Sequence, residues 1–339
     1  MFKTLKKCLK NIICISFLFS GLANAQIVFT PFQNNSSYKG TWKLENDVPN
    51  YIAAYLREFH SVDVLSAGTY LSLASEKTND KSLYSDLEFI SQFASEYDFK
   101  YAATGKINSF NISRFTAGEP LIAGYESYNC EIEIFIQFFN LQTNTSEFIG
   151  TVKGEVTDKG LGLTLLGKPT EEKKEYFALN SIQFGGEEFN QTIVGETIFQ
   201  LCQNLTKEIQ SKKNNFLNIT NQNRIKLEIP DKSLEDIKLN TEIKKGQILT
   251  YDESTGEAFV NLGSANNVWV GEELSIYTLA DSLYDPSSNE FLGVSDKKIS
   301  ILEIIEVRGE KLSLAVVKSN RDKVKEGMEV RKLILKKKK

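Results

Sequence analysis

The stretch YNCEIEIFIQFFNL, residues 128–141, decides the fold class, because its side chains alternate along the chain. The even positions from Cys130 to Phe138 are apolar. The odd positions between them are Glu131, Glu133, Phe135 and Gln137. Successive side chains of a strand point to opposite faces of a sheet, so this period of two predicts a strand with one buried and one half-exposed face.

The residues that follow extend this strand into a sheet with a helix. EFIGTVKGEV (147–156) comes after a turn at residues 142–146, which predicts a β-hairpin. Residues 187–210 then carry apolar side chains at the spacing of one helical face. These side chains are Val194, Ile198, Leu201, Cys202, Leu205 and Ile209.

Strands and helices alternate in the residues that come before. IVFTPF (27–32), VDVLSAG (62–68) and KYAATGKINSF (100–110) have the composition of strands. The segments NDVPNYIAAYLREF (46–59) and DLEFISQFASEYD (86–98) place apolar side chains on one helical face. This order of elements predicts the α+β class, with a mixed sheet and helices packed on it.

The second half of the chain has the pattern of a separate all-β domain. Beyond residue 243, short strand-like segments are separated by turns rich in Gly, Asn and Asp, which predicts a small barrel or sandwich over residues 244–335. The Asn-rich stretch at 211–223 indicates that residues 211–243 link this domain to the α+β domain at residues 26–210. Residues 336–339 are a basic tail of four lysines.

The first 25 residues have the three parts of a secretory signal peptide. Lysines form the positive end, Ile12–Leu22 is apolar, and the small residues Ala23 and Ala25 precede the expected cleavage before Gln26. The alternative, a retained membrane helix, needs roughly 20 apolar residues, and this run is shorter. The sequence therefore predicts export to the periplasm or to the periplasmic face of the outer membrane.

Cleavage at this site leaves two cysteines, Cys130 and Cys202. Cys130 lies on the apolar face of its predicted strand, and Cys202 lies on the apolar face of the last helix of its domain. An oxidising compartment permits a disulfide between them, which would join helix to sheet. Two buried free thiols are the alternative, since cysteine is often buried unpaired.

The sequence carries little that could support catalysis. His60 is the single histidine, and neither a phosphate-binding loop nor a nucleophile elbow is present. Without the four leader lysines, 36 basic and 44 acidic residues give a net charge of −8. This charge disfavours nucleic acid as a partner, because phosphate binding needs clustered Lys and Arg. We expect a protein that is not an enzyme and that uses no cofactor or metal.

Residues 154–186 form a long insertion between the hairpin and the last helix of the α+β domain. Its two limbs, GLGLTLLG (160–167) and EYFALNSIQF (175–184), flank a charged tip. Each limb approaches the roughly 9–11 residues of a transmembrane strand. A hairpin that enters the outer membrane and a flexible or packing loop are both open.

Several segments of the first domain, taken in order, resemble one group of envelope proteins. Residues 26–210 are similar to the curli-secretion channel family (CsgG-like) and to the amino-terminal domain of TolB-type envelope proteins. The segments that carry the resemblance are IVFTPF, VDVLSAG, DFKYAATGKINSF, IEIFIQFFNLQTNTSEF and FGGEEFNQTIVGETIFQLCQNLTKEI. In the last of these, Gly195 opens the final helix as it does in that family.

The second domain resembles another such family. Residues 244–332 are similar to the C-terminal domain of the flagellar T-ring protein family (FlgT-like). The segments that carry this resemblance are KGQILTYDESTGEAFVNLGSANNVWVGEELSIY, DPSSNEFLG and VKEGMEVRK. Both resemblances imply envelope proteins that assemble into rings or channels without catalysing a reaction.

Two features depart from the curli channel family. Its subunits carry lipid on a Cys at the first mature position, where this chain has Gln26. Each subunit also inserts two membrane hairpins, and the residues between Lys106 and Tyr128 are expected to be too short and too polar for the first one. These departures argue against a secretion pore.

The sequence as a whole predicts a non-enzymatic, exported assembly or scaffold protein of the cell envelope, associated with a secretion or surface-structure apparatus. Its expected partners are copies of itself or other envelope proteins. Phe135 and Phe139 on the strand and Trp269 in a turn are candidates for the contact surface, with local packing as the alternative for each. The second hypothesis is a curli-type outer-membrane channel subunit that inserts residues 154–186 as a hairpin.

Overall fold

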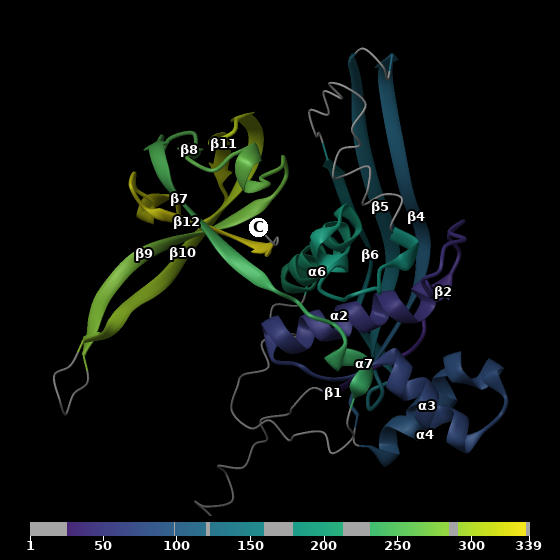
Figure 1. Cartoon of the computed structure of the whole chain (residues 1–339). Coiled ribbons are helices and arrows are strands. Elements are labelled where there is room, and N and C mark those ends of the chain that lie inside the picture. Colours follow the sequence, from purple (N-terminus) through teal and green to yellow (C-terminus); the bar gives the residue numbers. More distant parts are fainter. Residues whose placement is uncertain are drawn as a thin grey trace, which may run out of the picture. The chain divides into compact units, whose positions relative to one another are not determined.

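The computed structural model describes residues 26–97, 99–119, 123–158, 179–212, 231–284 and 291–336. The chain divides into two compact units, one up to Asn240 and the other from Thr241 to Lys336 (Figure 1). The first unit has helices on a mixed sheet and the second is a closed barrel, which confirms the predicted α+β class and selects the barrel over the sandwich. The predicted signal peptide, most of the predicted linker and residues 337–339 lie outside the described residues.

The sheet of the first unit is parallel at one end and antiparallel at the other. Its strands follow the order β3-β1-β4-β5-β6. Their bounds are β1 Gln26–Phe29, β3 Asp63–Leu65, β4 Tyr101–Glu119, β5 Ala123–Asn140 and β6 Thr145–Asp158. β1 pairs in parallel with β3 and β4, whereas β4, β5 and β6 are antiparallel neighbours. The short β2 (Gln33–Asn34) pairs in parallel with β4.

Two pairs of helices cover different parts of this sheet (Figure 1). α6 packs on the face that holds the even positions of β5, and α2 packs beside α6. α3 and α4 pack on the other face at the parallel end, where their side chains form one core cluster with Val28 and Ala102. The bounds of these helices are α2 Leu44–His60, α3 Ala67–Lys77, α4 Leu87–Glu96 and α6 Ile193–Lys212.

α3 is a helix that the sequence pattern does not reveal. The sequence predicts a strand over residues 62–68, but β3 ends at Leu65. The physical reason is Ser66, whose hydroxyl oxygen accepts a hydrogen bond from the Thr69 N–H at 3.1 Å. This is the standard cap of a helix N-terminus, and it turns the chain directly from strand to helix.

The hairpin of β4 and β5 is longer than expected. Its strands stay paired as far as Glu119, which lies opposite Ala123. The stretch between Lys106 and Tyr128 is therefore long enough for an extended hairpin, and the expectation that it is too polar to enter a membrane stays a prediction. The length that the sequence did not predict is residues 111–119, which pair with residues 123–131. A bulge after Ile107 also puts Ile107 and Phe110 on the same buried face although they are three residues apart. The period of two is thereby lost from the sequence at this point.

α2 begins at Leu44, and a carboxylate from its own first turn caps it. Asp47 Oδ2 accepts a hydrogen bond from the Lys43 N–H at 2.7 Å. Burial raises the pKa of Asp47 to about 6, because poorly solvated surroundings disfavour the charged carboxylate. The folded chain therefore holds this proton more tightly than the unfolded chain does.

Asp47→Asn should flatten the dependence of stability on pH. Proton binding by Asp47 contributes fully to the free energy of unfolding below the ordinary pKa of 3.8, and this contribution is lost as the pH rises through about 6. Urea unfolding from about pH 4 to pH 7 measures it. We expect the wild type to lose more stability than the variant over this range, and parallel curves would contradict the assignment.

The second unit is an antiparallel barrel with the closed strand order β10-β11-β8-β7-β12-β9. The bounds are β7 Thr241–Tyr251, β8 Glu257–Val260, β9 Glu273–Tyr284, β10 Phe291–Gly309, β11 Leu312–Val317 and β12 Glu329–Leu335. Its core is aliphatic and includes Ile248, Val260, Ile276, Ile304 and Val330. Closure pairs each strand on both sides, which removes exposed sheet edges.

Candidate assembly surface

No described helix covers the face of the first sheet opposite α6 at the antiparallel end. β5 directs its odd positions to this face, and the register aligns them with exposed side chains of β4 and β6. We call these residues the open face. They are Lys106, Asn108 and Asn111 of β4, Glu131, Glu133, Phe135, Gln137 and Phe139 of β5, and Ile149, Thr151, Lys153 and Glu155 of β6.

One half of the open face is apolar. Phe135 and Phe139, which the sequence proposes as contact residues, are both half-buried here. Ile149 of β6 stands opposite Gln137, which lies between the two phenylalanines, and Ile149 is 53% exposed. Diagonal neighbours on one face of a sheet are close enough to form a single contact area. Ile149 is not among the contact residues that the sequence predicts. The signal that could have found it is its place next to the buried Phe148 in EFIGTVKGEV, because neighbouring residues of a strand point to opposite faces.

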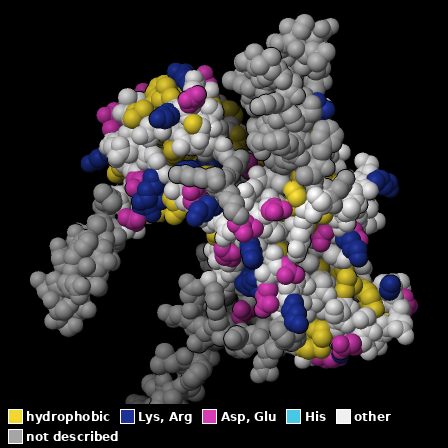
Figure 2. Space-filling model, viewed as in Figure 1, with side chains coloured by type: hydrophobic (Ala, Val, Ile, Leu, Met, Phe, Trp, Pro, Cys, Tyr) yellow, Lys and Arg dark blue, Asp and Glu magenta, His cyan; other side chains and the backbone are white. Residues whose placement is uncertain are grey.

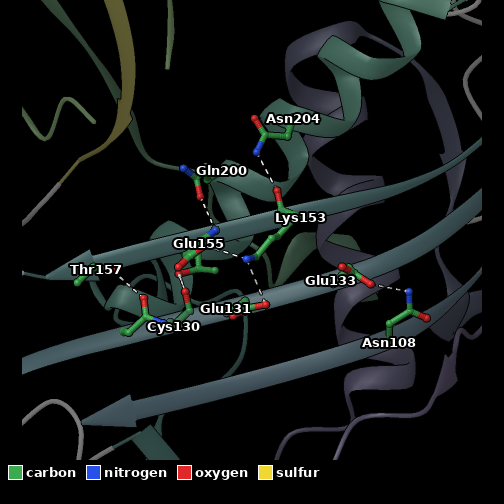
Figure 3. Close-up of polar contacts among 11 residues, drawn as sticks. Asn108, Cys130, Glu131, Glu133, Lys153, Glu155, Thr157, Gln200 and Asn204 are labelled. Atoms are coloured by element: carbon green, nitrogen blue, oxygen red, sulfur yellow. Dashed lines mark hydrogen bonds and ion pairs between the residues drawn. The ribbon is translucent and has the colours of Figure 1, made fainter. Parts of the chain in front are cut away.

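The other half of the open face is charged (Figure 3). Lys153 Nζ lies 3.3 Å from a carboxylate oxygen of Glu131 and 2.8 Å from one of Glu155. Asn108 donates a hydrogen bond to Glu133 at 2.9 Å. The bond to Glu155 raises the pKa of Lys153, yet exposed pairs of this kind contribute little to stability. They instead set a pattern of charge that a partner surface must match.

α6 blocks the outer edge of β6. Among the described strands this one pairs with β5 alone, so its far side would otherwise present unpaired backbone groups to them. Gln200 Oε1 accepts a hydrogen bond from the Glu155 N–H at 2.6 Å, and Asn204 Nδ2 donates to the Lys153 carbonyl at 2.8 Å (Figure 3). The two amides are one helical turn apart, so they reach the backbone groups on either side of Gly154. Another strand therefore cannot pair with β6 at Lys153 and Glu155 while α6 is in place.

Gly154 makes this close approach possible. A Cβ at this position would lie 2.4 Å from the Thr197 carbonyl oxygen and 3.1 Å from Leu201 Cβ. Both contacts are with α6, and the nearer one is with its backbone. A glycine in β6 thus allows the helix to reach the edge of the strand.

Trp269, the third proposed contact residue, lies over a buried ion pair in the barrel. Lys332 and Glu272 are 2% and 8% exposed, and their Nζ and Oε2 atoms are 3.0 Å apart. Lys332 Nζ also donates to the Asn267 carbonyl and lies 3.7 Å from the centre of the half-buried Trp269 ring, a cation–π contact. The ring therefore has a local packing partner. A role for Trp269 in assembly stays a prediction.

Both cysteines are buried free thiols in the structure. Cys130 lies in contact with Thr197 of α6, and burial raises the pKa of the Cys130 thiol to about 12. Cys202 lies near Tyr51 and Tyr55 of α2, and burial raises its pKa well above the ordinary value. The structure thus has the two-thiol alternative, and the disulfide stays a prediction.

We expect the two thiols to react only when the chain unfolds. Burial excludes the reagent, and a raised pKa keeps the thiolate, which is the nucleophile, scarce. Iodoacetamide at pH 8 should leave the mass of the folded protein unchanged and should add two groups after denaturation without reductant. A denatured chain that takes up no group would show that the disulfide has formed instead.

The described residues do not assemble a centre for metal binding. No group of three His, Cys, Asp or Glu side chains among them could hold a metal ion. His60 ends α2 and packs beside Tyr55, with 5.8 Å between ring centres, and burial lowers its pKa. Figure 2 shows acidic and basic side chains interspersed on this view of the first unit. The expectation that nucleic acid is not a partner stays a prediction.

The insertion at residues 154–186 is described only at its ends. Its start continues β6 to Asp158, and residues 159–178 lie outside the described part of the chain. At its end Leu179 and Phe184 are buried, and Trp42 Nε1 donates to the Ile182 carbonyl at 2.8 Å. This end of the return limb therefore packs on the first unit. No helix in the described ranges has the length and apolar character to cross a membrane.

Comparisons with known proteins find similarity in structure only. No family model matches the sequence, and a search of curated proteins finds no match. The lipoprotein GNA1162 from Neisseria meningitidis has 9% identity and a TM-score of 0.29, over 40% of this chain and 84% of that chain. The LpoB C-terminal domain from Salmonella enterica has 13% identity and a TM-score of 0.27, over 43% and 91%.

TolB from Acinetobacter baumannii is a longer chain with similar structure. It has 11% identity and a TM-score of 0.22, and the match covers 88% of this chain and 61% of TolB. At TM-scores this low, none of these similarities assigns a family or a function to the chain.

Proposed function

We propose that this chain is a non-enzymatic assembly protein of the cell envelope, exported to the periplasm or to the periplasmic face of the outer membrane. It associates with copies of itself as part of a secretion or surface-structure apparatus. The observation that supports this most is the apolar half of the open face. Phe135, Phe139 and Ile149 remain partly exposed there, on a face that the described helices leave uncovered at this end of the sheet.

The surrounding structure favours association through this face over association through a sheet edge. Gln200 and Asn204 occupy the backbone groups of β6 that an added strand would need. Aromatic and aliphatic side chains beside charged pairs have the mixture of side chains found in protein interfaces. Burying the two phenylalanines against a second copy supplies the driving force, and the charges on Lys153, Glu131 and Glu155 restrict which surface fits.

Light scattering on a sizing column tests the proposal on residues 26–339 without detergent. We expect a defined oligomer in the wild type and a monomer in the double variant Phe135→Ser/Phe139→Ser. Leu249→Ser is the control, because Leu249 is also exposed, at 45%, but lies on β7 of the barrel. It should leave the oligomer intact. A wild type that is monomeric at all concentrations, or an oligomer that survives the double change, would contradict the proposal.

An outer-membrane channel subunit is the second candidate, and the length of the β4–β5 hairpin favours it. These strands have 19 and 18 residues, whereas a transmembrane strand needs about 9–11. In this candidate the insertion at residues 154–186 supplies the other hairpin. Outer-membrane fractionation with release only by detergent would move it ahead of the first proposal. Recovery of the exported chain without detergent would exclude it.

A further inference from the structure

The segment Asp231–Leu239, which we call the strap, is bound along the first unit immediately before the barrel begins at Thr241. It contains the short α7 (Lys232–Glu235), which lies beside α2 and α3 (Figure 1). The residues that the strap contacts in the first unit are far from it in sequence. A carboxylate side chain makes the contacts at its first end, and backbone groups make most of those at its second end.

The first end of the strap is held at the start of α3 by hydrogen bonds to one carboxylate. Asp231 Oδ2 accepts a hydrogen bond from the Ser66 N–H at 2.7 Å. Its Oδ1 accepts hydrogen bonds from the hydroxyls of Ser66 and Thr69, both at 2.8 Å. A carboxylate at a helix N-terminus also interacts favourably with the helix dipole, and charge-assisted hydrogen bonds are stronger than neutral ones. One side chain therefore provides most of the polar attachment at this end.

The middle of the strap is held by burial and by a backbone contact. Leu234 is buried, and its carbonyl accepts a hydrogen bond from Arg57 of α2 at 3.1 Å. Ser233 lies so close to Gly68 that a Cβ on this glycine would be 2.6 Å from the serine hydroxyl. The surface of α2 and α3 is thus shaped to fit this segment.

The second end of the strap is tied to the core of the first unit. The Lys238 N–H donates to the Gly185 carbonyl at 3.0 Å, and the Lys238 carbonyl accepts from the Asn190 side chain. Asn190 in turn accepts a hydrogen bond at 2.8 Å from the hydroxyl of Tyr51, which is fully buried. Leu239 is buried as the last anchored residue.

We infer that the strap fixes the point on the first unit from which the chain leaves for the barrel. The connector from the end of α6 at Lys212 to Thr241 is 28 residues long. Extended, it could reach about 95 Å, at about 3.4 Å per residue. With the strap docked, only Asn240 separates the last anchored residue from the barrel. The strap thus limits the distance that the barrel domain can reach from the first unit, with Asp231 holding its first end and Asn190 its second.

Distance measurements between spin labels on the two units of the full mature chain test this inference. Labels at Ser95→Cys of α4 and Ser254→Cys of the β7–β8 turn use exposed positions, and the native cysteines are buried. The double variant Asp231→Ala/Asn190→Ala, which releases both ends of the strap, should shift the distances to longer values and widen their distribution. Hydrogen exchange at residues 231–239 should rise in the same variant.

A matched control removes a different carboxylate cap. Asp86 accepts hydrogen bonds from the Glu88 and Phe89 N–H groups at the start of α4, so Asp86→Ala loses similar hydrogen bonds outside the strap. It should keep the wild-type distance distribution. If the double variant fails to fold, Asn190→Ala alone releases the side-chain contact to Lys238 at the end next to the barrel and should give the same shift on a smaller scale. Unchanged distances with a released strap, or unchanged exchange in the double variant, would overturn the inference.

Discussion

Lys332→Met should lower the free energy of unfolding of the barrel by about 3–5 kcal/mol, the range for removing one partner of a buried ion pair. The change leaves the Glu272 carboxylate buried without its cation, and it removes the donor to the Asn267 carbonyl. It also removes the ammonium that lies over the Trp269 ring. The loss is large because the charge left behind has little access to water.

Urea unfolding followed by tryptophan fluorescence measures this loss. The chain has two tryptophans, so a Trp42→Phe background makes Trp269 the reporter of the barrel. Lys245→Met is the matched control, because Lys245 pairs with Glu329 at 3.3 Å but its side chain is 58% exposed. Such a pair contributes about 1 kcal/mol or less. Equal losses in the two variants would show that the Lys332 pair is not buried as described.

Gly154→Val should lower the free energy of unfolding of the first unit by about 3 kcal/mol or more, at the upper end of the usual cost of overpacking. The new Cβ would meet the Thr197 carbonyl at 2.4 Å, so α6 must move away from β6. That movement breaks the hydrogen bonds from Gln200 and Asn204 to the strand. We expect the variant to aggregate as well, because the exposed edge of β6 can then pair with other chains.

Two further variants separate these effects. Gly309→Val is the control for the residue change itself, since a side chain there meets open space, and it should change stability little. The double variant Gln200→Ala/Asn204→Ala removes the caps without forcing the helix away. It should aggregate more than the wild type, measured by light scattering over time, with a smaller loss of stability than Gly154→Val. A double variant that stays dispersed would show that the amides do not protect the edge.

The alternation in residues 128–141 correctly predicts which side chains of β5 are buried. The even positions from Cys130 to Phe138 are all buried, and Glu131, Glu133, Phe135 and Gln137 are all half-exposed on the opposite face. The geometry of a strand causes this agreement, because the side to which a residue points depends only on its place in the strand. The same argument holds for the aliphatic core of the barrel.

Where the local pattern is interrupted, the sequence is a poorer guide. The bulge after Ile107 breaks the alternation within β4, and a serine cap replaces the end of a predicted strand with α3. The open face was predicted in part, since Phe135 and Phe139 stand out by alternation, whereas Ile149 becomes part of it only through its register with Gln137.

The spacing of neighbouring residues was enough to predict the class of the fold, an all-β second domain and the buried face of β5, because these properties depend on local patterns. The tertiary structure alone decided which distant groups meet. Asp231 reaches the start of α3, Gln200 reaches the edge of β6, and Lys332 finds Glu272 inside the barrel. The reason is physical: each of these contacts compensates the cost of burying a polar group, and its partner depends on how the whole chain packs rather than on any local repeat.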